Sequence, residues 1–284
     1  MSYLWPNLWP TLSAPLAEPK LRVLSLGAGV QSTVLALASS GGDVGPLPDC
    51  AIFADTQWEP RKVRKHLAWL RTQLRFPVFD VTAGSIRQSI FDRRNTTGGR
   101  FAAVPWFIRN PDGTAGMGRR QCTKEYKLAP ITKKIRELVG APGRERIVPG
   151  SVEVWVGIST DEIERMKPAR QLFLRNRWPL IEAGMSRRDC ERWLAERQWS
   201  APKSSCIGCP FHSNAMWRDM RDNEPEDWAD ACEMDRQLRL GSNGKMRGEE
   251  YMHPSLMPLS EAPIDEADSD QLGFQLECEG MCGV

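Results

Sequence analysis

The feature that most constrains the fold is a repeated alternation of short apolar segments with longer stretches of helical spacing. Apolar runs that need not alternate with polar residues are typical of strands buried on both faces. Such runs occupy residues 22–26, 50–54, 77–81 and 152–158. Helical spacing occupies residues 32–38, 60–74, 127–138, 186–196 and 226–240. The pattern predicts an α/β fold with a parallel, twisted sheet that carries helices on both faces.

The chain divides into four regions by composition and spacing. We expect an N-terminal arm over residues 1–20, an α/β domain over 21–183, a helical region with a Cys-x-x-Cys pair over 184–253, and an acidic tail with terminal cysteines over 254–284. Ser186, followed by Asp189, predicts the N-cap of the helix over 186–196. A Gly- and Arg-rich stretch, residues 92–121, interrupts the alternation and predicts a long loop that covers the substrate.

Composition indicates in which cellular compartment the protein is expected. The 284 residues contain no apolar run of about 18 residues, so no membrane span is predicted, and the start lacks the pattern of a secretory signal. Eight cysteines in such a chain are more typical of metal or catalytic sites in a reducing compartment than of a disulfide framework. We therefore expect a cytoplasmic protein. Free cysteine packs as a small hydrophobe, which is the interpretation we give Cys50, Cys190 and Cys232.

Charge is unevenly distributed although the net charge is only +2. Residues 87–146 contain fourteen Lys or Arg against five Asp or Glu, and residues 222–284 contain four against sixteen. A basic middle segment can face an anionic substrate, and the acidic tail can fold over it or compete for it. The alternative is a solvated surface with ordinary unevenness.

A glycine turn follows the first predicted strand. Gly27, Ala28 and Gly29 give backbone N–H groups room to approach phosphate oxygens, and Ser32 adds a hydroxyl at the start of a helix. The turn has neither the Gly-Lys-Ser/Thr of a P-loop nor the Gly-x-Gly-x-x-Gly of a dinucleotide site. An ordinary tight turn between a strand and a helix is the alternative interpretation.

Three cysteines form the most informative spacing. Cys122 precedes the pair Cys206 and Cys209, which stand as Cys-Ile-Gly-Cys-Pro. Thiolates in such patterns bind metal or iron–sulfur groups. A tetrahedral zinc site on the same residues is the structural alternative to a cluster.

Position by position, the glycine turn resembles the PP-loop of the adenine nucleotide alpha-hydrolase superfamily, with Gln31 at the place of its Asp and Ser32 at its final Ser. Residues 53–59 and 156–165 resemble the corresponding segments of phosphoadenosine phosphosulfate (PAPS) reductases. The resemblance covers roughly residues 22–211. It implies that ATP or another adenine nucleotide, with Mg²⁺ as a candidate companion, binds at Ser25, Gly27, Ala28, Gly29, Gln31, Ser32, Asp55, Thr56, Gly157, Glu162 and Arg165.

The cysteine pattern resembles that of adenylylsulfate (APS) reductases, which carry a [4Fe–4S] cluster. Cys122, Lys127 and Pro130 match the first half of their pattern, Thr123 stands at the place of a second cysteine, and Cys206 and Cys209 match the later pair. The resemblance implies a [4Fe–4S] cluster on three cysteines, which leaves one iron open as in PP-loop tRNA thiolases. Candidate fourth ligands are Cys190, His212, Cys278 and Cys282.

The tail resembles the mobile Glu-Cys-Gly-Leu-His end of sulfonucleotide reductases through Glu277 and Cys278. The resemblance implies that Cys278 or Cys282 is a nucleophile or sulfur carrier, because thiolates of lowered pKa are strong nucleophiles. An unremarkable flexible tail is the alternative. Fork-like donors suit oxyanions, so the candidate phosphate or sulfate contacts are Arg100, Arg119, Arg120 and Lys127.

These features predict an enzyme of sulfur metabolism that transfers sulfur to an acceptor, with a nucleobase or nucleic acid as a candidate. The alternatives are a sulfonucleotide reductase that forms sulfite, and a zinc-stabilised nucleic-acid-binding module without turnover. The expected partners are the adenine nucleotide and a sulfur donor or reductant protein, with no membrane; a homodimer is a further candidate.

Overall fold

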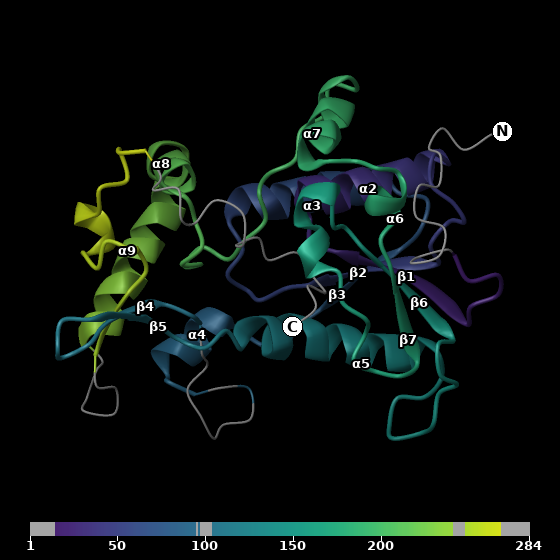
Figure 1. Cartoon of the computed structure of the whole chain (residues 1–284), viewed down its shortest axis with the longest axis horizontal. Coiled ribbons are helices and arrows are strands. Elements are labelled where there is room, and N and C mark those ends of the chain that lie inside the picture. The colour runs from purple at the N-terminus through teal and green to yellow at the C-terminus, as the bar shows by residue number, and fades with distance from the viewer. Residues whose placement is uncertain (1–14, 95, 97–103, 241–247, 268–284) are drawn as a thin grey trace.

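The computed structural model describes residues 15–94, 96, 104–240 and 248–267, and it is built around a five-stranded parallel sheet (Figure 1). The strand order is β3-β2-β1-β6-β7, and every neighbouring pair is parallel. The predicted α/β fold with a parallel sheet is therefore confirmed. Its strands are β1 (Leu21–Leu26), β2 (Cys50–Ala54), β3 (Val78–Val81), β6 (Val152–Val156) and β7 (Leu174–Arg177).

Helices cover both faces of this sheet (Figure 1). On one face, α2 (Val30–Gly41), α3 (Arg61–Gln73) and α7 (Arg187–Ala195) pack in one core with Leu24 and Phe53, next to the short α6 (Pro179–Glu182). On the other face, α5 (Ala129–Leu138) buries Ile131 and Ile135 against side chains of β1, β2 and β6. Both faces of the central strands are apolar, which explains why their sequences read as continuous hydrophobic runs.

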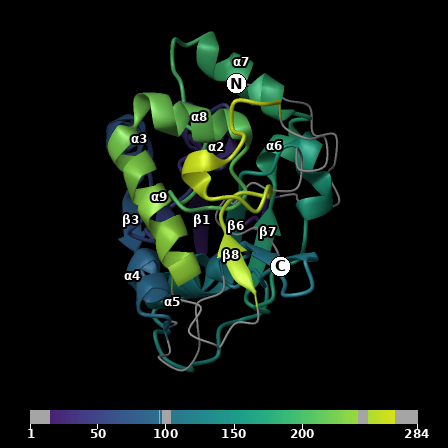
Figure 2. The same cartoon turned by 90° about the vertical axis from the view of Figure 1, so that its left-hand side faces the viewer.

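A third core lies beside the sheet, where segments far apart in the chain meet (Figure 2). Trp106, Tyr126 and Trp217 are completely buried in it. Its elements are α4 (Ile86–Phe91), the π-helical turn η1 (Thr123–Leu128), α8 (Asn214–Asn223), α9 (Pro225–Leu240) and the 3₁₀ turn η3 (Leu259–Glu261). The short strands β4 (Phe107–Arg109), β5 (Ala115–Met117) and β8 (Glu249–Tyr251) form a separate three-stranded sheet.

The segment 92–121, predicted as a loop, contains a hairpin. Strands β4 and β5 pair antiparallel, and β8 pairs with the other edge of β4. At the turn, Gly113 has φ +82° and its N–H donates to the carbonyl of Asn110 at 2.9 Å. Strands of three residues are too short to show the two-residue alternation by which a strand is found in a sequence.

Helix boundaries agree well with the sequence pattern. Ser186 caps α7 through a capping box, in which Asp189 N–H donates to Ser186 Oγ at 3.1 Å and Ser186 N–H donates to Asp189 Oδ2 at 2.9 Å. The predicted helix over 127–138 is preceded by η1, so helical backbone already begins at Cys122. Within the described ranges, no helix has the length and apolar character needed to cross a bilayer.

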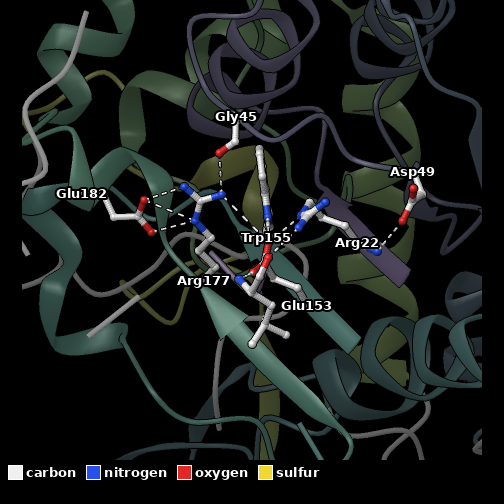
Figure 3. Close-up of polar contacts among 8 residues, drawn as sticks. Arg22, Gly45, Asp49, Glu153, Trp155, Arg177 and Glu182 are labelled. Carbon is white, nitrogen blue, oxygen red and sulfur yellow. Dashed lines mark hydrogen bonds and ion pairs between the residues drawn. The ribbon is translucent and has the colours of Figure 1, made fainter. Parts of the chain in front are cut away.

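A buried ionic network joins three strands at the sheet (Figure 3). Glu153 Oε1 accepts from Arg22 Nε at 2.9 Å and from Trp155 Nε1 at 2.7 Å. Arg177 forms a bidentate pair with Glu182, at 2.9 Å through Nε and 2.7 Å through Nη2, and its guanidinium lies 4.7 Å from the centre of the Trp155 ring. Strands β1, β6 and β7 are thus joined by charges as well as by backbone hydrogen bonds.

Glu153→Gln is expected to lower the free energy of unfolding by about 3–5 kcal/mol, because removal of one partner leaves a buried guanidinium uncompensated. Urea unfolding measures the loss. Glu196→Gln, which changes an exposed carboxylate, is the control and should stay within about 0.5 kcal/mol of wild type. Equal stabilities of the two variants would contradict the role given to the network.

Candidate functional site

The sheet has a topological switch point between β1 and β6. From β1 the chain adds β2 and β3 on one side, and it later adds β6 and β7 on the other. Ligands of open α/β sheets bind in the crevice at the carboxyl ends of the strands where the order reverses. Here that edge carries the turn Gly27–Gly29 after β1 and Gly157 after β6. The fold therefore brings two of the predicted nucleotide-binding segments to one place.

The glycine turn has an uncommon backbone. Ala28 has φ +58°, a left-handed conformation that non-glycine residues seldom adopt and that concentrates at functional sites. Gly29 is the N-cap of α2, and its N–H donates to Ser32 Oγ at 3.2 Å. Ser32 Oγ in turn donates to the Gly29 carbonyl at 3.3 Å. The Ser32 hydroxyl thus holds the turn at the positive end of the helix.

Gly157 lies against the first turn of α2. A Cβ at this position would be 3.0 Å from both Cα and N of Ser32, which is backbone that cannot move aside cheaply. The absence of a side chain lets β6 and α2 approach closely at the switch point. Gly157 was predicted from the resemblance alone, and the structure supplies the steric reason for a glycine there.

Gln31 connects the turn to the segment after β6. Its side chain is completely buried, and Nε2 donates to Glu162 Oε2 at 3.3 Å and to Ser159 Oγ at 3.5 Å. Glu162 also forms an ion pair with Arg165. Three predicted nucleotide-binding residues therefore lie together, although their contacts are with one another.

The end of β2 is tied directly to the Cys-x-x-Cys pair. Thr56 donates to Glu59 Oε1 through its N–H at 3.0 Å and through Oγ1 at 2.6 Å, and Thr56 Oγ1 lies 3.2 Å from Cys206 Sγ. Burial raises the pKa of Glu59 above its ordinary value, with a further upward effect from Asp55. Asp55 Oδ1 accepts from Gln57 N–H at 2.7 Å, and Gln57 itself has a left-handed backbone with φ +60°.

Cys122, Cys206 and Cys209 line one pocket, which we call the cysteine pocket. Its wall also includes Thr56, Trp58, Arg120, Lys127 and Phe211. Cys122 immediately precedes the π-helical turn η1, a form of helix that is frequent at functional sites. Residues 84 positions apart in the chain are therefore brought to the same cavity, as the metal prediction requires.

Trp58 and Trp106 pack against the Cys-x-x-Cys turn and form hydrogen bonds with it. A Cβ on Gly208 would lie 2.1 Å from the ring of Trp58, so the ring packs directly on the glycine. Trp106 Nε1 donates to the Gly208 carbonyl at 3.3 Å, and Ile207 N–H donates to the Trp58 carbonyl at 2.8 Å. The turn is held in place from two sides before any group binds to its thiols.

Electrostatics at the pocket oppose a free thiolate at Cys206. Burial raises the pKa of the Cys206 thiol well above its ordinary value, and the positive charge of Lys127 acts in the opposite direction. Metal ligation requires the deprotonated thiolate, and a bound cation lowers thiol pKa values strongly. Burial therefore disfavours a free thiolate nucleophile at Cys206.

Lys127 also lines a second cavity, which we call the turn pocket. The turn pocket is lined by Gly27 of the glycine turn, Glu59, Ser204 and Ser205, together with Leu26, Phe53 and Ala54. Ser204 and Ser205 directly precede Cys206. One lysine thus borders both the glycine turn and the three cysteines.

The remaining predicted residues are placed differently. Arg120 lines the cysteine pocket, with its guanidinium 5.2 Å from the centre of the Phe211 ring, whereas Arg119 is exposed. Ser25 is buried within β1. Arg100, Cys278 and Cys282 lie outside the described residues, so their predicted roles stay predictions.

Two candidate fourth ligands fall within the described ranges. Cys190 is completely buried in the core that contains α2 and α7, and it does not line the cysteine pocket. His212 is buried, with Nε2 2.6 Å from Ser205 Oγ, and burial lowers its pKa to about 3. Cys50 is buried as expected, whereas Cys232 is half-buried. Because Cys190 is completely buried in that core and does not line the cysteine pocket, it is better interpreted as a core residue than as a fourth ligand.

Trp58, Glu59, Ser204 and Ser205 belong to the site but were not among the predicted site residues. Glu59 follows Thr56 by three residues, and the serines adjoin Cys206, so proximity to a motif was the available signal.

Within the described part of the chain, no three His, Cys, Asp or Glu side chains are grouped closely enough to hold a single metal ion. No protein-family model matches this chain, and no curated protein matches it.

Gly157→Ala is expected to destabilise the fold by about 1–3 kcal/mol, because the added methyl group must push α2 away from the end of β6. Gly41→Ala, at the last residue of α2, is the control, since its Cβ would lie at an ordinary 3.8 Å from its nearest neighbour, Asp43 Oδ2. Urea unfolding compares the two. A Gly157→Ala protein as stable as Gly41→Ala would show that the close approach is not a real constraint.

Proposed function

We propose that this chain is an iron–sulfur-dependent PP-loop enzyme that binds an adenine nucleotide and transfers sulfur to an acceptor. The observation that carries the proposal is the shared wall of the two cavities: Lys127 borders the cysteine pocket and also the pocket that contains Gly27. A nucleotide at the switch point and a sulfur-handling group on the cysteines would be adjacent. This adjacency is what activation and sulfur transfer in one protein require.

Cys122, Cys206 and Cys209 would hold a [4Fe–4S] cluster. What supports this is that all three thiols line one pocket, and cysteine thiolates are the usual ligands of such clusters. When bound to three cysteines, the cluster supplies one iron that no cysteine occupies. Thr56 orients Cys206, and the two tryptophans orient the turn between Cys206 and Cys209.

The nucleotide would lie with its phosphates at the glycine turn. The N-terminus of α2 and Lys127 provide positive potential there, and Mg²⁺ would accompany the phosphates. Gln31 is neutral and hydrogen-bonded to Glu162, so in this chain it positions the segment after β6 rather than supplying a free carboxylate. Glu59 likewise accepts from Thr56 and from Trp58 N–H, which fixes the wall between the pockets.

Lys127→Met is expected to weaken ATP binding by about 10–100-fold, since a charge-assisted contact to phosphate contributes about 1.5–3 kcal/mol. Isothermal titration calorimetry on anaerobically prepared protein measures the change. Lys65→Met removes the same charge from an exposed position on α3 and should leave ATP affinity unchanged. Identical ATP affinities for Lys127→Met and wild type would contradict the proposed phosphate position.

Product analysis separates transfer from reduction. With ATP, the proposal expects AMP and pyrophosphate to be released only when an acceptor is added. Sulfite formed from APS or PAPS, without ATP cleavage, would instead identify the sulfonucleotide reductase and overturn the transferase assignment.

A further inference from the structure

A large basic groove lies beside the cysteine pocket, on the sheet face covered by α5. It has a volume of about 630 Å³, within the range of ligand sites. One wall is formed by η1 and α5, and the other by residues 167–171 with Asn176 of β7. We call it the basic groove, because its charged lining residues are Lys124, Lys133, Arg136, Lys167 and Arg170.

Four of the five charges of the basic groove have no acidic partner in the part of the chain that the structure describes. None of its lining residues is an Asp or Glu. Arg136 donates to the carbonyls of Gly143 and Glu145, at 2.9 and 2.7 Å, and pairs with the Glu145 carboxylate at 3.9 Å. Within the described part of the chain, the other four basic residues form no ion pair. Several like charges gathered around one cavity repel one another, so an anion that neutralises them binds favourably.

Regular secondary structure and a hydrogen bond hold the two walls of the basic groove in place. On the helical wall, Lys124, Leu128, Thr132 and Arg136 recur every four residues and so share one face. On the opposite wall, Asn176 Nδ2 donates to the Lys167 carbonyl at 2.9 Å and anchors that segment to β7. The charged side chains come from both walls: Lys124, Lys133 and Arg136 from the helical wall, and Lys167 and Arg170 from the opposite wall. Positive charge is therefore distributed over two walls rather than focused at one point.

We propose that the basic groove binds the phosphate backbone of a nucleic-acid strand. Several positive charges distributed over two walls suit a ligand with repeated negative charges better than one terminal phosphate group. Lys and Arg contacts of this kind position a strand without reading its sequence. The groove is separate from the turn pocket, where the nucleotide is proposed to bind.

This inference deepens the proposed function and rests on it for the identity of the acceptor. Lys124 of the groove and Lys127 of the cysteine pocket belong to the same π-helical turn, which Cys122 precedes. A strand held in the groove would therefore pass close to the cysteine pocket, which makes a nucleobase of that strand the acceptor.

The test measures binding of a fluorescein-labelled, mixed-sequence single-stranded RNA of 20 nucleotides, and of DNA of the same sequence, by fluorescence anisotropy over a range of salt concentrations. The variant is Lys133→Ala/Lys167→Ala/Arg170→Ala, which changes exposed residues only. We expect binding to be at least about tenfold weaker, and the slope of log K against log salt to fall by about 2, at roughly 0.7 per lost phosphate contact. A preference for RNA or for DNA distinguishes the two kinds of strand.

Arg64→Ala/Lys65→Ala/Arg75→Ala is the matched control, because it removes three exposed positive charges from α3 and the residues after it, on the other face of the sheet. It should bind the strand almost as wild type does. An equal loss in both variants would show that net charge alone controls binding and would overturn the proposal.

Two further measurements complete the test. Free tripolyphosphate should displace the strand only at much higher phosphate concentration; displacement at a similar concentration would show a site for small polyphosphates and overturn the proposal. Iron and sulfide contents of the same samples report on the proposed function separately. If protein without a cluster still binds the strand, and the groove variant weakens that binding, the groove proposal is supported although the proposed sulfur transfer is not.

Discussion

The pairing of β1 with β6 is the constraint on which the rest of the structure depends. These strands are neighbours in space although well over a hundred residues separate them in the chain, and their register places Arg22 beside Glu153. The buried pair between these two side chains ties the strands at one end, and the contact of Gly157 with the first turn of α2 ties them at the other. Because the strand order reverses here, the pairing also creates the crevice in which a ligand can bind.

The cysteine pocket follows from the same framework. Thr56 at the end of β2 lies 3.2 Å from Cys206 Sγ, so a strand of the central sheet positions one of the three thiols. Cys122 reaches the pocket because η1 leads directly into α5, which packs on the sheet. Lys127, one turn after Cys122, then faces both the cysteines and the glycine turn. Sulfur handling and phosphate binding are thus proposed for two cavities that share a residue.

Four of the five parallel strands and five of the helices could be predicted from the sequence, because buried strands and helical spacing leave strong local patterns; α4 and α8 were not predicted. That Cys122, Cys206 and Cys209 line one pocket was expected from their resemblance to a known cysteine pattern. Strand β7 could not be predicted, since Leu174–Arg177 is polar at three of four positions, and the burial of Arg177 depends on its pairing with Glu182. The antiparallel β4, β5 and β8 are too short for a local pattern and exist through contacts between distant segments. Glu59 and Trp58 belong to the site for the same reason: their roles depend on where Cys206 and Gly208 lie.

Iron, acid-labile sulfide and zinc per chain, measured on anaerobically purified wild type, Cys206→Ala and Cys232→Ala, test the central claim most directly. The account predicts about four irons and four sulfides in wild type and in Cys232→Ala, where the cysteine lies in α9 outside the pocket, and loss of both in Cys206→Ala. Stoichiometric zinc without sulfide, or equal iron in all three proteins, would contradict a cluster held by Cys122, Cys206 and Cys209.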